Sequence, residues 1–402
     1  MTRPSADLVV LAYSGGLDTT VTVHRLVHEQ GRAVVALLAD VGQGEDLPAL
    51  AERALAAGAS DAVVVDARER FAAEFLSSAV RANALYEGRY PLVSALSRPL
   101  IARLLVEEAR RRGAGAVAHG CTGKGNDQVR FEVSCGALAP DLEVLAPVRD
   151  AAMSRPEAIE YADKHRIDLG WITEAKPFSV DQNLWGRTIE AGVLEDPWLA
   201  PPEEAFEWTV GPGTASGTRE LVVGFRAGVP ATLDGEEAGL AGVVAALNRL
   251  GGEAGFGRVD MLENRRVGIK SREVYEVPGA LAVIAAHRDL EDLTLDRDVL
   301  HEKARLDIRY AELVYDGLWF SPLKAALDAF VAETQEAVTG EVRLELSPGR
   351  CQPTGRRAER ALYRPDLATY AAGDAFDHDA GRGFVSLWGL PARTWARVHG
   401  DG

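Results

Sequence analysis

Apolar residues in the first part of the chain gather in short unbroken runs instead of alternating with polar residues. Such runs are typical of parallel strands that are buried on both faces. Between the runs, apolar residues recur three and four positions apart, as on helices that pack against a sheet. The expected strands are 8–13, 33–40, 62–67, 115–120 and 142–147, with helices after 16, from 46 and over 98–112. We therefore predict an α/β domain built on a doubly wound parallel sheet of about five strands.

The pattern changes from residue 171 onward. Irregular segments containing Trp and Pro come first, and an alternating strand over 221–228 follows. Two helical stretches, 299–318 and 322–338, lead to 341–347, where apolar residues alternate with charged ones as in a half-exposed strand. A second domain, of the α+β class, is expected here.

The chain ends in a short amphipathic helical tail whose apolar members are Trp388, Leu390 and Trp395. From the residues alone, such a tail either covers its own domain or docks on another subunit. The expected parts are a parallel-sheet domain at 1–170, an α+β domain at 171–360 and the tail at 361–402.

Composition narrows the class of protein. Hydrophobic residues make up 47% of the 402 positions and charged residues 26%, which is ordinary for a globular enzyme. A formal net charge of −16 argues against a nucleic-acid partner, and no apolar run is long enough to cross a membrane. The three cysteines are widely spaced, which fits a reducing compartment, so we expect a cytoplasmic protein.

The first strand runs directly into a polar, glycine-containing turn, "AYSGGLDTT". Gly15 and Gly16 permit a tight turn and the close approach of a ligand, and the free N–H groups of the helix that follows favour an anion. Ser14 adds a hydroxyl, and Asp18 either caps the helix or faces a metal-bound phosphate. The P-loop pattern is absent, so this turn predicts a different kind of phosphate site.

A second dense polar stretch, "HGCTGKGNDQVRFE", follows a later strand end. Asn126 and Arg130 are four residues apart and would share a helical face, where an amide and a guanidinium can bind a carboxylate. The alternative is an N-cap with a solvated arginine.

Two other features carry less weight. His24 and His28 have a spacing that suits zinc, but no third ligand is near in sequence, so no metal site is predicted. The polar segments 177–198 and 260–279 are typical of binding loops, although domain-interface structure explains each equally well.

With these stretches in this order, the chain resembles the argininosuccinate synthase family, part of the adenine-nucleotide α-hydrolase-like group whose "PP-loop" is here "AYSGGLDTT". The segments "TGKGNDQVRFE", "LDRDVLHEKARLDIRYAELVYDGLWFSP" and "GEVRLEL" carry the resemblance, which runs from about Leu8 to Trp395. It implies an ATP-dependent ligase that joins citrulline to aspartate through a citrullyl-adenylate and releases AMP and pyrophosphate. It also implies Mg²⁺ on the phosphates, no prosthetic group, a catalytic and multimerisation role for 171–360, and a homotetramer in which the tail reaches a neighbouring subunit.

The resemblance also implies the site residues. ATP is expected at Ala12, Tyr13, Ser14, Gly15, Gly16, Leu17, Asp18, Thr19, Thr20, Ala39 and Gly120. Aspartate is expected at Thr122, Asn126 and Asp127, and citrulline at Tyr90, Asn126, Arg130, Ser179, Thr188, Glu263 and Tyr275. Asp18, Asp127 and Arg130 are the expected catalytic residues.

Several positions depart from the usual family pattern. In "VSALSRP", Ser94 replaces a threonine and Ala95 replaces a serine that faces citrulline, and Thr188 stands for a serine. Further departures are Arg266, Glu273 and Val277. They keep open a paralogue that couples aspartate to a different ureido or carboxyl acceptor; a nucleotide-binding regulator without turnover is a third class.

Overall fold

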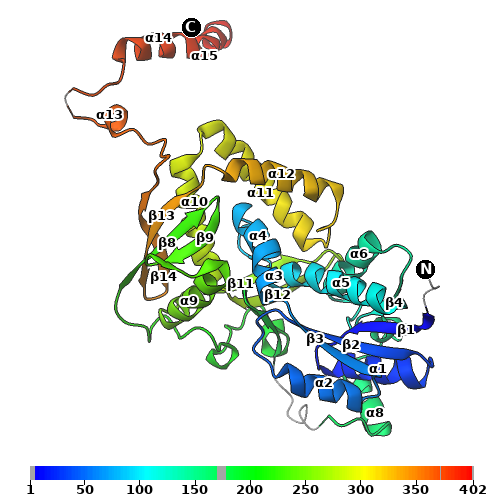
Figure 1. The fold of residues 1–402 in the computed structure, drawn as a ribbon. Helices are drawn as coiled ribbons and strands as arrows, with labels where there is room; N and C mark the ends of the chain where they lie inside the picture. The colour runs from blue at the N-terminus through cyan, green and yellow to red at the C-terminus, as the bar shows by residue number, and fades with distance from the viewer. Residues whose placement is uncertain (1–4, 170–177, 372, 401–402) are drawn as a thin grey trace. The chain divides into compact units, whose positions relative to one another are not determined.

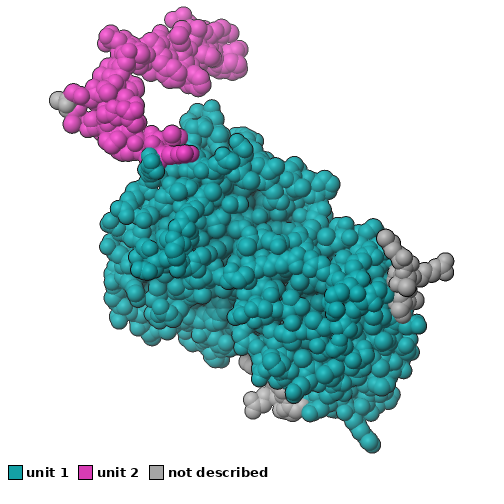
Figure 2. All heavy atoms as spheres, in the orientation of Figure 1, with its two compact units in different colours: residues 1–359 teal, residues 360–402 magenta. Residues whose placement is uncertain are grey.

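The computed structural model describes residues 5–169, 178–371 and 373–400. The chain divides into two compact units, residues 1–359 and residues 360–402 (Figure 2). The boundary predicted near residue 171 lies outside the described residues.

A five-stranded parallel sheet forms the first part of the larger unit, in the order β3-β2-β1-β4-β5 (Figure 1). This confirms the predicted doubly wound α/β domain. Its strands are β1 (Ser5–Ala12), β2 (Ala33–Asp40), β3 (Asp61–Asp66), β4 (Ala114–Ala118) and β5 (Glu143–Leu145). Its helices are α1 (Leu17–His28), α2 (Leu47–Ala56), α3 (Arg68–Arg70), the π-helix η1 (Phe71–Leu76), α4 (Ser77–Arg81), α5 (Val93–Arg112), α6 (Asp127–Leu138), α7 (Pro147–Asp150) and α8 (Arg155–Lys164).

The central strand β1 buries side chains on both faces of this sheet. Val9 and Leu11 are completely buried in one apolar cluster, while Val10, between them, is completely buried in another. A strand covered on both faces needs no polar alternation, which explains the unbroken apolar run in the sequence. One boundary differs from the prediction. Helix α5 begins at Val93 instead of 98, so Pro99 lies inside the helix and not at its start.

The rest of the larger unit contains two antiparallel sheets, in the orders β10-β9-β8-β13-β14 and β11-β12-β7-β6. The strands are β6 (Ser179–Asn183), β7 (Gly186–Glu190), β8 (Arg219–Arg226), β9 (Val229–Leu233), β10 (Glu236–Glu237), β11 (Arg258–Asn264), β12 (Lys270–Glu276), β13 (Gly340–Ser347) and β14 (Arg350–Arg357). The helices are η2 (Gly192–Glu195), η3 (Glu203–Ala205), α9 (Gly239–Glu253), α10 (Pro278–Thr294), α11 (Arg297–Tyr315) and α12 (Pro322–Gln335). The predicted α+β class is confirmed, and Val342, Leu344 and Leu346 of β13 are buried as their alternation indicates.

The described residues of the smaller unit form the helices α13 (Pro365–Ala368), α14 (His378–Trp388) and α15 (Leu390–His399). Within it, Phe384 and Trp388 stack with their ring centroids 5.6 Å apart, and both side chains are exposed. Across the described part of the chain, no helix combines the length and apolar character needed to span a bilayer.

Candidate active site

The turn between β1 and α1 leaves the start of a helix bare. Gly15 has a φ of +73°, and a Cβ there would lie 2.5 Å from a methyl group of Leu50, so the position requires glycine. Gly16 occupies the N-cap of α1 without a side-chain capping bond. Its carbonyl oxygen accepts hydrogen bonds from the Thr19 hydroxyl at 3.2 Å and the Thr20 hydroxyl at 2.8 Å, which fixes the first turn of the helix. An uncapped helix N-terminus suits a phosphate.

Other residues expected at ATP surround this turn. The Tyr13 hydroxyl lies 3.0 Å from that of Thr20. Gly120, just after β4, packs so closely that a Cβ there would lie 2.8 Å from Cγ2 of Thr19. Burial raises the pKa of Asp18 above its usual value, although the charge of Arg155 acts in the opposite direction. At the end of β2, the Ala39 carbonyl accepts a hydrogen bond from Nε2 of Gln43 at 2.9 Å.

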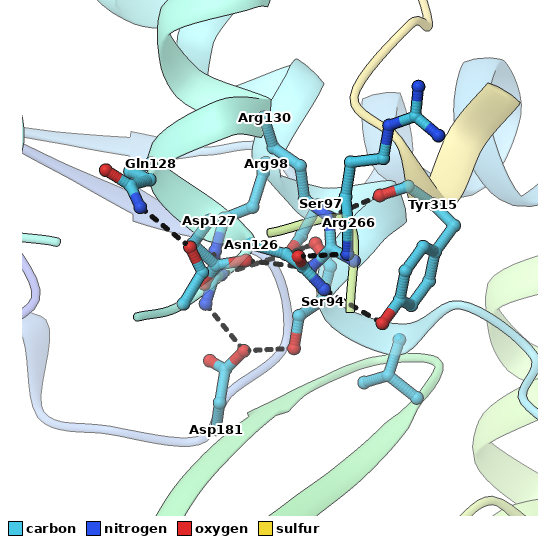
Figure 3. A network of polar contacts seen from close by, with 12 residues as sticks. Ser94, Ser97, Arg98, Asn126, Asp127, Gln128, Arg130, Asp181, Arg266 and Tyr315 are labelled. Atoms are coloured by element: carbon cyan, nitrogen blue, oxygen red, sulfur yellow. Dashed lines mark hydrogen bonds and ion pairs between the residues drawn. The ribbon is translucent and has the colours of Figure 1, made fainter. Parts of the chain in front are cut away.

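Asp127 is held between two arginines (Figure 3). Nη1 of Arg130 donates to one carboxylate oxygen at 2.9 Å, and Nε of Arg98 donates to the other at 2.8 Å. Burial favours the neutral carboxyl group, but the two guanidinium groups outweigh it and lower the pKa of Asp127 to about 2. Asp127 is therefore an anion throughout the physiological pH range.

Asn126 and Arg130 converge on Tyr315. Nδ2 of Asn126 donates to the Tyr315 hydroxyl at 2.8 Å, and Nε of Arg130 donates to the Tyr315 carbonyl at 3.1 Å. The alternative interpretation of this pair holds only in part: Asn126 does occupy the N-cap position of α6, but Arg130 is not solvated. Asn126 makes no side-chain capping bond, and Arg130 is 5% exposed.

Most of the residues expected at citrulline lie on one face of the sheet β11-β12-β7-β6. Thr188 is paired with Asp181 on one neighbouring strand and with Tyr275 on the other, so the three side chains point the same way. Ser179 lies two residues from Asp181 and shares this face. The Thr188 hydroxyl is buried and lacks a hydrogen-bond partner among the described residues, which leaves it available to a ligand.

Glu263 joins this face from β11. It accepts hydrogen bonds from the hydroxyl groups of Tyr275 and Tyr315, the latter at 2.7 Å. Tyr90 stacks on Tyr275 with ring centroids 4.3 Å apart. Burial raises the pKa of Glu263 to about 7, against the lowering effects of Tyr315 and Arg130.

The residues that depart from the usual family pattern lie in different surroundings. Ala95 is completely buried within the apolar core, whereas the Ser94 hydroxyl donates to Asp181 at 2.5 Å. Nη2 of Arg265 donates to the carboxylate of Glu273 at 2.5 Å and to that of Glu190 at 2.6 Å. Burial, followed by the charge of Glu190, raises the pKa of Glu273 to about 8.

Arg98, Asp181 and Tyr315 are central to this network but were not among the predicted site residues. Each lies in a stretch that already attracted attention, namely "VSALSRP", the polar segment 177–198 and the long segment that contains "AELVYDGLWFSP". The sequence therefore indicated the stretches that contain these residues. It did not reveal their partners, which lie 29 to 189 positions away in the sequence. Thr122, by contrast, is exposed on the loop before α6.

The histidine pair of α1 lies close to a third histidine. His24 and His28 lie with ring centroids 4.3 Å apart, and His165 of the neighbouring chain segment lies 4.8 Å from His24. Within the described ranges, no group of three or more His, Cys, Asp and Glu side chains is arranged to hold a metal ion.

Comparison with known proteins gives a consistent result over nearly the whole chain. A family model described as "Arginosuccinate synthase N-terminal HUP domain" matches residues 8–168, and one described as "Arginosuccinate synthase C-terminal domain" matches residues 178–395. Argininosuccinate synthase from Rubrobacter xylanophilus is 58% identical over 394 residues, covering 98% of this chain and 96% of its own. The enzyme of the same name from Halalkalibacterium halodurans is 55% identical over 396 residues, covering 98% and 96%. That from a Geobacillus strain is 54% identical over 400 residues, covering 99% and 98%.

Proposed function

The chain belongs to the argininosuccinate synthase family, and we propose that the residues described above perform the reaction of that family. The protein is an ATP-dependent ligase of arginine biosynthesis that condenses L-citrulline with L-aspartate to argininosuccinate. The reaction passes through a citrullyl-adenylate and releases AMP and pyrophosphate.

One observation supports the placement of the amino-acid substrates best. Groups of opposite charge, Arg130 and Glu263, both lie against Tyr315: the guanidinium carbon of Arg130 is 5.0 Å from the centre of the ring, and the hydroxyl donates to Glu263 at 2.7 Å. The charge of Arg130 lowers the pKa of Glu263, which indicates that the two groups are close enough to interact. A free α-amino acid carries one carboxylate and one ammonium group, so it needs a cation and an anion close together. We assign citrulline to this place, with its chain along Thr188 and Tyr275.

ATP is assigned to the bare start of α1, with adenosine toward Ala39 and Gly120. The described residues offer no cluster of protein ligands for a metal, so a Mg²⁺ ion is expected to bind mainly to phosphate oxygens, with Asp18 as the nearest carboxylate of the turn. When bound, Mg²⁺ neutralises phosphate charge. The helix start and the Ser14 hydroxyl would orient the α-phosphorus, while the Thr19 and Thr20 hydroxyls fix the first turn of α1 through the Gly16 carbonyl.

The chemistry needs activation because a ureido oxygen is a poor leaving group. The oxygen attacks the α-phosphorus and displaces pyrophosphate; the amine of aspartate then attacks the ureido carbon and AMP leaves. We assign Asn126, Asp127 and the exposed Thr122 to aspartate. Because the pKa of Asp127 is about 2, this carboxylate attracts and orients the ammonium group and is a poor base for removing its proton.

The reaction is tested by measuring AMP formation with ATP, Mg²⁺ and aspartate across citrulline and a panel of ureido and carboxyl amino acids. We expect citrulline to give the highest kcat/KM. An acceptor preferred more than about tenfold over citrulline would instead support a paralogue with a different acceptor.

The phosphate site is tested separately with Asp18→Ala. Loss of phosphate alignment is expected to lower pyrophosphate release by about 100-fold or more in a folded variant. A folded Asp18→Ala protein that turns over like wild type would refute the assignment of Asp18.

The remaining assignments concern organisation. We propose that residues 1–170 bind ATP, that 171–360 complete the catalytic site and contribute to multimerisation, and that 361–402 form an oligomerisation tail. The assembly is assigned as a homotetramer in the cytoplasm. The stacked, exposed Phe384 and Trp388 support the role of the tail.

A further inference from the structure

Arg98 connects elements that belong to different substrate sites (Figure 3). It lies on α5, and its side chain is 15% exposed. Nε of Arg98 contacts Asp127 at the start of α6 at 2.8 Å, and Nη2 contacts Asp181 of β6 at 2.6 Å. Two carboxylates, one at the start of helix α6 and one on strand β6, are thus held by one planar guanidinium group.

The two carboxylates are themselves fixed by further bonds. Arg130 holds the second oxygen of Asp127, and the Ser94 hydroxyl donates to the same Asp181 oxygen that Arg98 contacts. Nη1 of Arg98 lies 3.2 Å from the Ser97 hydroxyl, which donates to the Ser94 carbonyl. All three guanidinium nitrogens of Arg98 are therefore engaged, and the angle between the carboxylates is set by the plane of the fork.

Each end of this bridge leads to a different amino-acid substrate. Asp127 belongs to the assigned aspartate site. Asp181 is paired across the sheet with Thr188, which in turn is paired with Tyr275, and these are assigned to citrulline. A shift at one end of the bridge therefore moves a group in the other site.

We propose that Arg98 is a positioning residue that couples the aspartate and citrulline sites by fixing Asp127 and Asp181 relative to each other. This inference rests on the proposed function of the two sites. It requires the bidentate geometry of arginine, because a lysine ammonium in the same place has no planar fork to orient both carboxylates.

Two substitutions disrupt the bridge, one at its central arginine and one at the Asp181 end. For Arg98→Lys, we expect KM to rise at least about threefold for both aspartate and citrulline, and kcat to fall. Asp181→Asn is more diagnostic, because Asp181 lies outside the assigned aspartate site. It is expected to raise KM for aspartate as well as for citrulline. In the double variant the loss of kcat/KM should be at least about threefold smaller than the product of the single losses.

Arg103 provides a matched control on the same helix, since it pairs with the partly exposed Glu74 at 2.5 Å. Arg103→Lys is expected to leave both KM values unchanged. Thermal unfolding of every variant separates a general loss of stability from a change in substrate binding. If Arg98→Lys does not fold, the effect of Asp181→Asn on the KM for aspartate decides whether the two sites are coupled.

Two results would overturn the inference: an unchanged KM for aspartate in Asp181→Asn, or strictly multiplicative losses in the double variant. Calorimetric binding of each amino acid, with a non-hydrolysable ATP analogue present, provides the same comparison without turnover. A failure of the proposed function looks different, because the wild-type protein itself would then neither bind citrulline nor form AMP with it.

Discussion

Ser94 and Ala95 are adjacent on α5, yet only one of them reaches the polar network. The Ser94 hydroxyl bonds Asp181 at 2.5 Å, while Ala95 is completely buried among apolar side chains. The departure at residue 95 therefore removes a hydroxyl from a place where this chain has apolar packing. This arrangement favours citrulline as the acceptor in spite of the departure.

Ala95→Ser is accordingly expected to change KM for citrulline by less than about twofold. It should lower the free energy of unfolding by about 1 to 3 kcal/mol, because the new hydroxyl is buried without a partner. Steady-state kinetics and chemical denaturation measure the two effects. A two- to tenfold fall in KM would contradict this prediction and place residue 95 against the substrate.

Glu263 predicts a dependence of citrulline binding on pH. Burial raises its pKa to about 7, and its assigned role is to attract the ammonium group of citrulline as a carboxylate. As the pH falls below 7, the carboxylate is protonated and KM for citrulline should rise about tenfold per pH unit. The same shift means that the contribution of Glu263 to the stability of the free protein falls as the pH rises through 7.

Glu263→Gln provides the comparison for that titration. This variant cannot ionise, so it should bind citrulline weakly and show a flat KM between about pH 6 and 8. If its profile retains the wild-type slope, another group carries the titration.

At the scale of elements, the contact between the end of β4 and the start of α1 shapes the phosphate site. A Cβ at Gly120 would lie 2.8 Å from Cγ2 and 3.2 Å from the backbone nitrogen of Thr19. Gly120→Ala must therefore push the first turn of α1 away from β4. We expect KM for ATP to rise by about tenfold or more, since a small misplacement of a positioning element costs catalysis heavily.

Gly123→Ala is the matched control for that change. A Cβ there would meet its nearest neighbour, Cγ of Arg149, at 3.5 Å, which is ordinary contact. Initial rates measured against ATP should therefore separate the two variants, and equal values of KM for ATP would refute the role of Gly120.

Local patterns predicted the elements of the first domain well because the central strands β1 and β2 are continuous apolar runs buried in the sheet, which are easily recognised in the sequence. The turn before α1 and the polar stretch before α6 were visible for the same reason: their residues are neighbours in sequence. Arg98 and Asp181 could not be paired in this way, since they are 83 positions apart and meet only where helix α5 packs against strand β6. The start of α5 was also missed, because Pro99 in the sequence suggests a helix beginning and not a helix interior.

At the scale of the whole molecule, none of the described residues of the smaller unit is buried. The large apolar side chains of α14 are Phe384, Val385, Leu387 and Trp388, which fall within one half of the helix surface and are 61%, 65%, 73% and 77% exposed. On α15, Trp395 and Val398 are 68% and 70% exposed. Exposed apolar surface of this extent is typical of a subunit contact.

Removing residues 391–402 is therefore expected to weaken the proposed tetramer, because the truncation deletes most of α15 and its Trp395. Trp395→Ala should act in the same direction with a smaller change to the chain. Arg397→Ala, also on α15, serves as the control because it removes a charged side chain and leaves the apolar residues in place. Sedimentation velocity over a range of concentrations measures the change as a shift toward smaller species. If the truncated protein keeps the wild-type distribution at every concentration, the tail does not join subunits, and its apolar face must be covered within one chain.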